Sequence, residues 1–219
     1  MWCVPEITIE FKERMEGVLT LYEKPYNPKE PVICFDEKSK QLLKDTKKTK
    51  QTKEGKPRRK DYEYERNGTK NIFVTVEPKE GFRSVSVTER RTREDFAKEM
   101  ERIITLKRYR KVKRMHIVLD NLNTHFEKSI REIFSKKKSN RILRKIEFHH
   151  TPKHASWLNM AEMEIGVMEK QCTKGRVGSK EGLQKKISIW QKARNRKKAK
   201  INWKFTVEDA RRKFKYGQD

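Results

Sequence analysis

The sequence has little of what builds disulfide-rich, membrane-spanning or disordered proteins. Its 3 cysteines among 219 residues are far apart and match neither a disulfide framework nor a zinc-finger spacing. No apolar run approaches the ~18 residues of a membrane span. Hydrophobic residues make up only 33% of the chain, but they cluster in short runs, which argues against disorder. We therefore expect a folded protein in a reducing, cytoplasmic setting with no membrane partner.

Negative charge is the other shortage. Lysine and arginine number 56 against 31 aspartates and glutamates, so the formal net charge is +25. Such an excess calls for a polyanionic partner, and nucleic acid is the default one. A structural nucleic-acid binder without a catalytic site is an open alternative at this point. A basic protein with no anionic partner is the least favoured interpretation.

The centre of the chain alternates between strand and helix patterns. Apolar runs, turn signals such as Asn67-Gly68, and a capping-box pattern at Thr92 to Asp95 mark the boundaries. The predicted elements are a strand at 31–36, two or three antiparallel strands within 61–89, a helix from 92, a strand at 115–120, a short helix at 129–135, a strand at 142–149 and a helix carrying Glu162. This order predicts a mixed α/β fold, with an antiparallel meander followed by parallel strands and flanking helices.

The two ends differ from this centre. Residues 6–22 show helical spacing and lead into a proline-rich stretch, while two glycines after Cys172 precede a basic, amphipathic helical tail. We therefore divide the chain into a lead-in helix and linker (1–30), a central α/β domain (31–174) and a basic helical extension (175–219).

Two basic segments are candidates for binding DNA. One is the polar stretch 44–60, which is equally well explained as a solvated loop; the other is the tail, which could instead only cover the sheet. We favour a DNA contact for the tail because its charge is clustered on helices. The candidate residues are Lys47, Lys48, Arg58, Arg59, Lys197, Lys198, Arg211 and Arg212.

Three acidic residues stand in settings that suggest chemistry. Asp36 and Asp120 each end an apolar run, and Glu162 lies beside Leu158 and Ile165 at the border of the apolar face of its predicted helix. On the same helical wheel Glu164 points well away from that face. Each residue alone is explained as well by a turn, a cap or a surface position. Their combination in this α/β order, with strong basicity, favours a shared site.

Clustered carboxylates suit metal-dependent phosphodiester chemistry. Two divalent ions ~3.5–4 Å apart can activate an attacking water or 3′-hydroxyl and stabilise the leaving oxygen. Mg²⁺ prefers carboxylate, phosphate and water ligands, and it makes a cluster of like charges tolerable.

Three segments together resemble a known family. They are residues 32–37, residues 116–125 with Asp-Asn-Leu-Asn-Thr-His, and residues 151–162 with Thr-Pro, Ser-Trp-Leu-Asn and Glu162. In these segments the chain resembles the mariner-like transposases of the bacterial insertion-sequence family six-thirty, with their DDE endonuclease domain. The resemblance extends over about residues 2–216 and is most specific in the third segment.

The resemblance implies a ribonuclease-H-like fold and a metal-binding, catalytic triad of Asp36, Asp120 and Glu162. It implies Mg²⁺, with Mn²⁺ as a substitute and two ions expected, for cleavage at transposon ends and transfer of the 3′-hydroxyl into target DNA at a TA dinucleotide. Family motifs also match at residues expected to support the site, although each could be purely structural: Asn121, Asn123, His125, Trp157 and Asn159.

Family members usually carry an N-terminal helix-turn-helix region that recognises the transposon ends, and this chain begins after it. The resemblance implies double-stranded DNA as partner, a homodimer or larger assembly on DNA, a separate N-terminal DNA-recognition chain if the element encodes one, and a nucleoid-associated protein of a prokaryotic cytoplasm. Two alternatives remain open, namely a catalytically silent DNA-binding remnant and a ribonuclease H-like nuclease.

Overall fold

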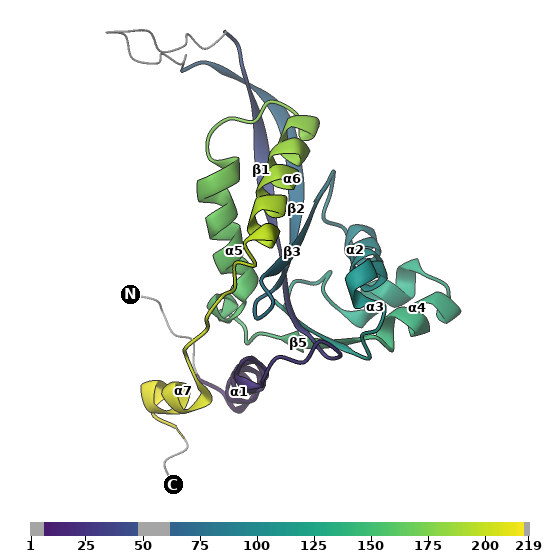
Figure 1. Cartoon of the computed structure of the whole chain (residues 1–219), viewed down its shortest axis with the longest axis vertical. Coiled ribbons are helices and arrows are strands. Elements are labelled where there is room, and N and C mark those ends of the chain that lie inside the picture. Colours follow the sequence, from purple (N-terminus) through teal and green to yellow (C-terminus); the bar gives the residue numbers. More distant parts are fainter. Residues whose placement is uncertain (1–6, 48–61, 217–219) are drawn as a thin grey trace.

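The computed structural model describes residues 7–47 and 62–216. Seven helices and five strands follow one another within this part of the chain (Figure 1). In chain order they are α1 (Ile9–Glu23), β1 (Val32–Asp45), β2 (Tyr64–Glu77), β3 (Phe82–Thr88), α2 (Arg93–Thr105), β4 (Met115–Leu119), α3 (Glu127–Ile133), α4 (Lys136–Leu143), β5 (Ile146–His150), α5 (Met160–Met168), α6 (Lys180–Arg196) and α7 (Val207–Phe214).

The strands form one mixed sheet in the order β3-β2-β1-β4-β5. The first three strands pair antiparallel, as β1 with β2 and β2 with β3. Strand β4 then joins β1 in parallel, and β5 joins β4 in parallel. The predicted meander followed by parallel strands is therefore confirmed.

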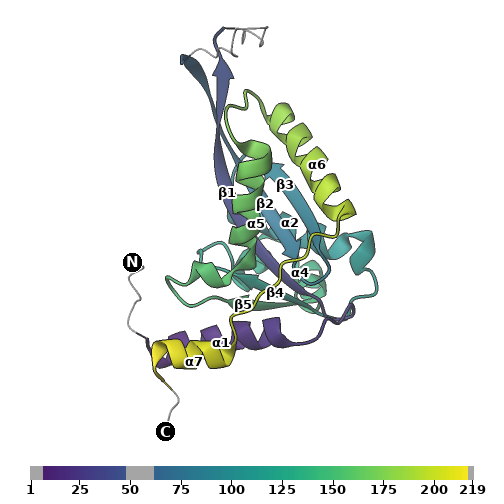
Figure 2. The same cartoon turned by 60° about the vertical axis from the view of Figure 1, so that its left-hand side comes forward.

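Helices cover both faces of the sheet (Figures 1 and 2). On one face, α2, α3 and α4 pack on side chains such as Ile33, Phe35 and Ile117. On the other face, α1, α7 and the start of α5 pack around Cys34 and Val118. Farther along that face, α5 and α6 enclose a third cluster around Val74. Because side chains alternate along a strand, even-numbered residues at the start of β1 face α1 and α5.

The first strand is longer than the sequence predicted. Its polar second half pairs with β2 up to Asp45↔Tyr64, so Asp36 lies within β1 and the predicted strand end at 36 is wrong. Backbone pairing and the burial of Leu42 hold this polar half in the sheet. Lys44 and Asp45 accordingly belong to β1 and not to a loop, while residues 48–61 lie outside the described part of the chain.

Asn67-Gly68 is not the hairpin turn that its sequence suggests. Both residues lie inside β2, where the register with β1 shifts between Gln41 and Leu43. Gly68 has φ +74°, which suits a bulge that takes up one extra residue. The residues that favour a turn therefore form a bulge within the long antiparallel pair of β1 and β2.

The elements that follow agree better with the sequence. A capping box at Thr92 and Asp95 opens α2 as predicted. Residues Lys136–Leu143 form a helix that we did not predict, so the last strand begins at Ile146 and not at 142. Helix α6 belongs to the predicted amphipathic tail and buries Leu183, Ile187 and Trp190.

The tail packs on the same face of the sheet as α1 and α5. After α6, the chain crosses the turn between β2 and β3, where Ile201 N donates to Pro78 O (3.1 Å). A β-carbon at Gly81 would lie 2.5 Å from the Lys198 carbonyl, so this crossing requires glycine. Helix α7 then runs beside α1 (Figure 2). Among the described residues, no helix combines the length and apolarity needed to cross a membrane.

Candidate active site

Asp36 and Asp120 occupy equivalent positions on neighbouring parallel strands. The ladder of β1 and β4 pairs Cys34 with Val118, and each aspartate lies two residues beyond its member of that pair. Asp36 therefore projects toward α1 and α5, and Asp120 lies close enough for its charge to raise the pKa of Asp36. The two aspartates that end apolar runs in the sequence thus lie near each other, although only Asp120 directly follows a strand.

Glu162 is brought to the same place by the residue that begins its helix. Asn159 is the N-cap of α5, and its side-chain oxygen accepts a hydrogen bond from Ala161 N (3.1 Å). The amide nitrogen of Asn159 donates to Phe35 O (2.8 Å), the carbonyl just before Asp36. One buried side chain thus ties the helix of Glu162 to the strand of Asp36.

The electrostatics of Asp36 reflect this convergence. Burial raises its pKa to about 7, although the backbone N–H of Glu37 stabilises the charged form. The negative charges of Asp120, Glu37 and Glu162 add to the increase. Within the described residues, no lysine or arginine forms an ion pair with Asp36 or Glu162. The site thus holds negative charge that the surrounding side chains leave largely uncompensated.

His125 connects Asp120 to a fourth carboxylate. Its Nδ1 lies 2.6 Å from an Asp120 oxygen, and its Nε2 lies 3.0 Å from an oxygen of Glu37. Burial works against the charged imidazole, yet the two carboxylates raise the pKa of His125 to about 9. Burial also raises the pKa of Asp120, but the bond and charge of His125 outweigh it and bring that pKa below its ordinary value. His125 therefore orients Asp120 and is more than a turn cap.

Glu37 and Arg14 are site residues that the sequence did not reveal. Glu37 follows Asp36 on a strand and so points to the opposite face, under His125. Arg14, on α1, donates to the side-chain oxygen of Asn121 (2.5 Å). Adjacency to Asp36 was the only signal for Glu37, and nothing in the sequence links Arg14 to a residue 107 positions away.

The remaining supporting candidates divide between the site and its scaffold. Asn121 donates to the carbonyl of Thr151 and so joins the loop after β4 to the loop after β5. Asn123 is exposed in the turn that His125 N closes on Leu122 O. Trp157 packs edge-on against Phe205, with ring centres 5.7 Å apart, and has a packing role.

Glu164 corrects one sequence prediction. It does not point away from the protein but is buried at 1% exposure, where Arg83 and Arg194 each contact its carboxylate with two nitrogens. Glu162 is exposed instead. The helical wheel failed because two arginines, one on β3 and one on α6, make the burial of a carboxylate possible.

The basic residues proposed to bind DNA lie partly outside the described chain, since Lys48, Arg58 and Arg59 fall within 48–61. Lys47 is exposed and lies 3.4 Å from Glu63. Lys197 and Lys198 are exposed at the end of α6. On α7, Arg211 forms an ion pair with Glu16 (2.7 Å), and Arg212 with Asp209 (2.6 Å).

The donor set of the triad fits divalent metal ions. Carboxylate oxygens are the ligands that Mg²⁺ and Mn²⁺ prefer, and Mg²⁺ usually keeps several waters. The three carboxylates are spread more widely than a closed cage. Within the described residues, only His116, Glu147 and His149 have ligand atoms that all lie within 4.8 Å of one another. An open set of acidic oxygens leaves room for water and substrate oxygens in the coordination sphere.

Comparison with known families decides where the chain belongs. The family model described as DDE superfamily endonuclease matches residues 31–184, well over half of the chain. The chain belongs to the DDE superfamily endonucleases. Its matched region contains Asp36, Asp120 and Glu162 and ends within α6. No curated protein matches the sequence.

Solved structures show the fold of this DDE endonuclease. It is similar to Mos1 transposase in a paired-end complex with the left transposon end (TM-score 0.58, 16% identity, 88% of this chain and 58% of that chain). It is similar to the Mos1 mariner paired end complex with Mn (0.58, 16%, 91% and 60%) and to the Mos1 strand transfer complex (0.56, 16%, 90% and 60%). The predicted ribonuclease-H-like fold is confirmed, and the chain spans about three-fifths of the length of these solved chains.

Proposed function

We propose that this DDE endonuclease is the catalytic domain of a DNA transposase, which cleaves phosphodiesters at transposon ends and transfers the freed strand into target DNA. The observation that carries the proposal is the convergence of three carboxylates, since the charges of Asp120 and Glu162 both act on the buried carboxyl of Asp36. Family membership and the fold shared with Mos1 transposase support it. The net charge of +25 supports a DNA substrate.

Asp36, Asp120 and Glu162 would hold the metal, which we propose to be Mg²⁺ with Mn²⁺ as a substitute, in two ions per site. When bound, such ions activate the attacking oxygen and stabilise the leaving one. The uncompensated charge around Asp36 fits this role, because a site prepared for cations needs carboxylates without arginine partners.

The chain's own groups would keep these carboxylates in place. His125 holds one Asp120 oxygen at 2.6 Å and leaves the other for a ligand. Asn159 fixes the start of α5 relative to the backbone of Asp36. The hydrogen bond from Arg14 to Asn121 joins α1 to the loop that follows Asp120. DNA that contacts α1 could therefore shift the position of Asp120.

The partners and setting follow from the same proposal. Transposon ends and target DNA would be double-stranded substrates, bound in part by the exposed basic residues at the end of α6 and on α7. We propose a homodimer or larger assembly on DNA, end recognition by a helix-turn-helix region or a separate chain that carries it, and an origin in a bacterial insertion sequence acting at the nucleoid. The division into residues 1–30, 31–174 and 175–219 remains a prediction.

Nicking of supercoiled plasmid tests the proposal. We expect the wild type to convert plasmid to the open circle with Mg²⁺ or Mn²⁺ and not with Ca²⁺ or chelator. Asp120→Asn should lose this activity and keep salt-sensitive DNA binding. Glu181→Gln is the matched control, because it removes one exposed carboxylate from the first turn of α6, away from the triad.

Other outcomes separate the alternatives. Binding without nicking, even after addition of transposon ends and a helix-turn-helix partner, would identify a catalytically silent remnant. Cleavage of an RNA·DNA hybrid in preference to duplex DNA would identify a ribonuclease H-like nuclease. Nicking that survives Asp120→Asn would contradict the proposed site.

A further inference from the structure

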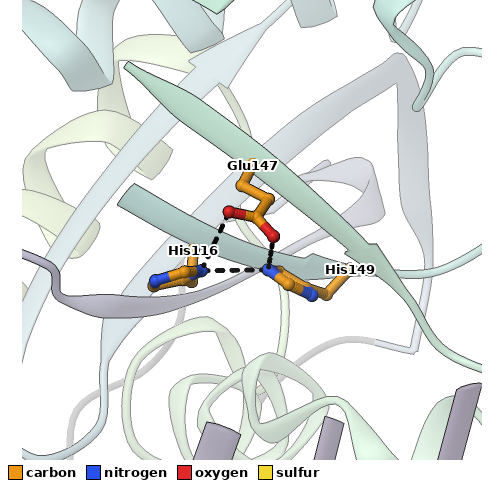
Figure 3. Close-up of side chains that lie close together, drawn as sticks. All are labelled: His116, Glu147 and His149. Carbon is orange, nitrogen blue, oxygen red and sulfur yellow. Dashed lines mark hydrogen bonds and ion pairs between the residues drawn. The ribbon is translucent and has the colours of Figure 1, made fainter. Parts of the chain in front are cut away.

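A second group of metal-ligand side chains lies on the parallel half of the sheet. His116 projects from β4, and Glu147 and His149 project from the edge strand β5 (Figure 3). His116 is the register partner of Glu147, and His149 follows Glu147 by two residues. All three side chains therefore extend from one face of the sheet and point toward one another.

The distances within this group suit a small tetrahedral ion. His116 Nδ1 and His149 Nε2 lie 3.0 Å apart, and each nitrogen lies 3.6 Å from a Glu147 oxygen. Ligands at ~2.0–2.1 Å from a tetrahedral zinc ion are separated by about 3.3–3.4 Å. We propose that His116, Glu147 and His149 bind Zn²⁺ or a similar late transition-metal ion, with a water as the fourth ligand.

The chemistry of the donors favours such an ion over Mg²⁺. Two imidazole nitrogens and one carboxylate suit zinc, whereas magnesium prefers oxygen ligands throughout. Metal binding requires neutral imidazole.

The surroundings supply orientation and access. Arg114 Nη1 lies 3.2 Å from a Glu147 oxygen and fixes that carboxylate, as outer groups do for metal ligands. His116 also lines a hollow of about 340 Å³ between the end of α1 and the start of β1, which gives an ion and its water a path from solvent. Lys24 and Arg114 place positive charge near His116, and Glu30 partly offsets it, so we expect only moderate affinity.

This site is separate from the triad. His116 precedes Asp120 by four residues, which is about 13 Å along an extended strand. A bound ion would join β4, which leads to Asp120, to β5, which leads to the segment that carries Glu162. The bound ion would hold the edge strand β5 to β4 and so stabilise the fold. This structural role does not depend on the transposase activity proposed above.

Titration of the chelator-treated full chain with Co²⁺ and Zn²⁺ tests the site. We expect one Co²⁺ per chain with the intense visible absorption of a four-coordinate ion, displaced by Zn²⁺ and retained in excess Mg²⁺. Glu147→Gln and His149→Gln should weaken binding at least ~10-fold. Zn²⁺ at about 100 times its dissociation constant should raise the Tm of the wild type by about 5–10 °C, and that of these variants by much less.

Controls distinguish this site from other metal-binding groups. His154→Asn removes an exposed histidine outside the cluster, at φ +61°, which asparagine accepts, and it should bind as the wild type does. Asp120→Asn should also keep the Co²⁺ spectrum. Glu147→Gln should fold as the wild type does, because 41% of the Glu147 side chain is exposed. An unchanged Tm without metal would show that any loss of binding in this variant is not due to misfolding. Loss of the spectrum in Asp120→Asn but not in His149→Gln, or no spectrum at all, would overturn the proposal.

Discussion

Two glutamates on one helix differ in how the rest of the chain treats their charge. Glu164 is buried on α5 and its charge is balanced by Arg83 and Arg194. Glu162, two residues earlier, is exposed, and its charge acts on Asp36. Burial alone would raise the pKa of Glu164, but its two arginines bring the pKa below the ordinary value. Burial and neighbouring negative charge instead raise the pKa of Asp36.

The two regions differ in whether positively charged side chains balance the negative charge of the carboxylates. The Glu164 carboxylate is shared by two arginines, so removing it breaks a buried network that joins β3, α5 and α6. No lysine or arginine among the described residues forms an ion pair with Asp36 or Glu162, and we propose that a metal ion balances this negative charge. The first region should therefore respond to mutation in stability, and the second in activity.

The largest effect is expected at the uncompensated carboxylates. Asp36→Asn should reduce metal-dependent nicking at least ~100-fold, because a metal ion contributes several kcal/mol of transition-state stabilisation and ~1.4 kcal/mol corresponds to tenfold. The free energy of unfolding without metal should stay the same or rise, since a poorly compensated charge is removed. Plasmid nicking and urea unfolding measure the two quantities. A destabilised Asp36→Asn would show that this carboxylate has a structural partner.

Glu164→Gln should produce the opposite pattern. It leaves two arginines beside a neutral amide, and breaking a buried ion pair costs about 3–5 kcal/mol. Urea unfolding should show this loss, while nicking per folded molecule should remain. A change below ~1 kcal/mol would mean that the network contributes little to stability.

The pH dependence of stability should separate the two glutamates further. The folded-state pKa of Glu164 lies below its ordinary value of 4.5, so its contribution is complete above that pH and is lost as the pH falls through the folded pKa. Below about pH 4.5 this group should add a slope of at most ~1.4 kcal/mol per pH unit. Unfolding curves of wild type and Glu164→Gln at several acidic pH values should differ by that slope. If the stability of the two proteins changed equally with pH, the lowered pKa of Glu164 would be contradicted.

A smaller effect is expected where the two regions meet. Asn159→Ala removes the cap of α5 and the bond to Phe35 O, which should cost about 1–2 kcal/mol and also reduce nicking. Ser179→Ala removes the equivalent cap of α6, where its oxygen accepts from Gly182 N (3.0 Å), and should lower stability alone. Equal losses of nicking in the two variants would show that Asn159 acts only as a cap.

The sequence predicted what local patterns determine. Apolar runs located the start of β1 and β4, and Asp36 and Asp120 stood out because each ends such a run. A capping signal located the start of α2. Contacts between distant residues were not predictable: Arg83 reaches Glu164 across 81 positions, and the burial of Glu164 depends on it. Asn67-Gly68 failed for a related reason, because pairing with β1 extended the strand through a local turn signal.

The central claim is that Asp36, Asp120 and Glu162 form a metal site, and calorimetric titration of Mn²⁺ into the full chain tests it most directly. The account predicts that Glu162→Gln binds Mn²⁺ at least ~10-fold more weakly than the wild type, while Glu181→Gln binds as the wild type does. Equal Mn²⁺ affinity in the wild type and Glu162→Gln would contradict the account.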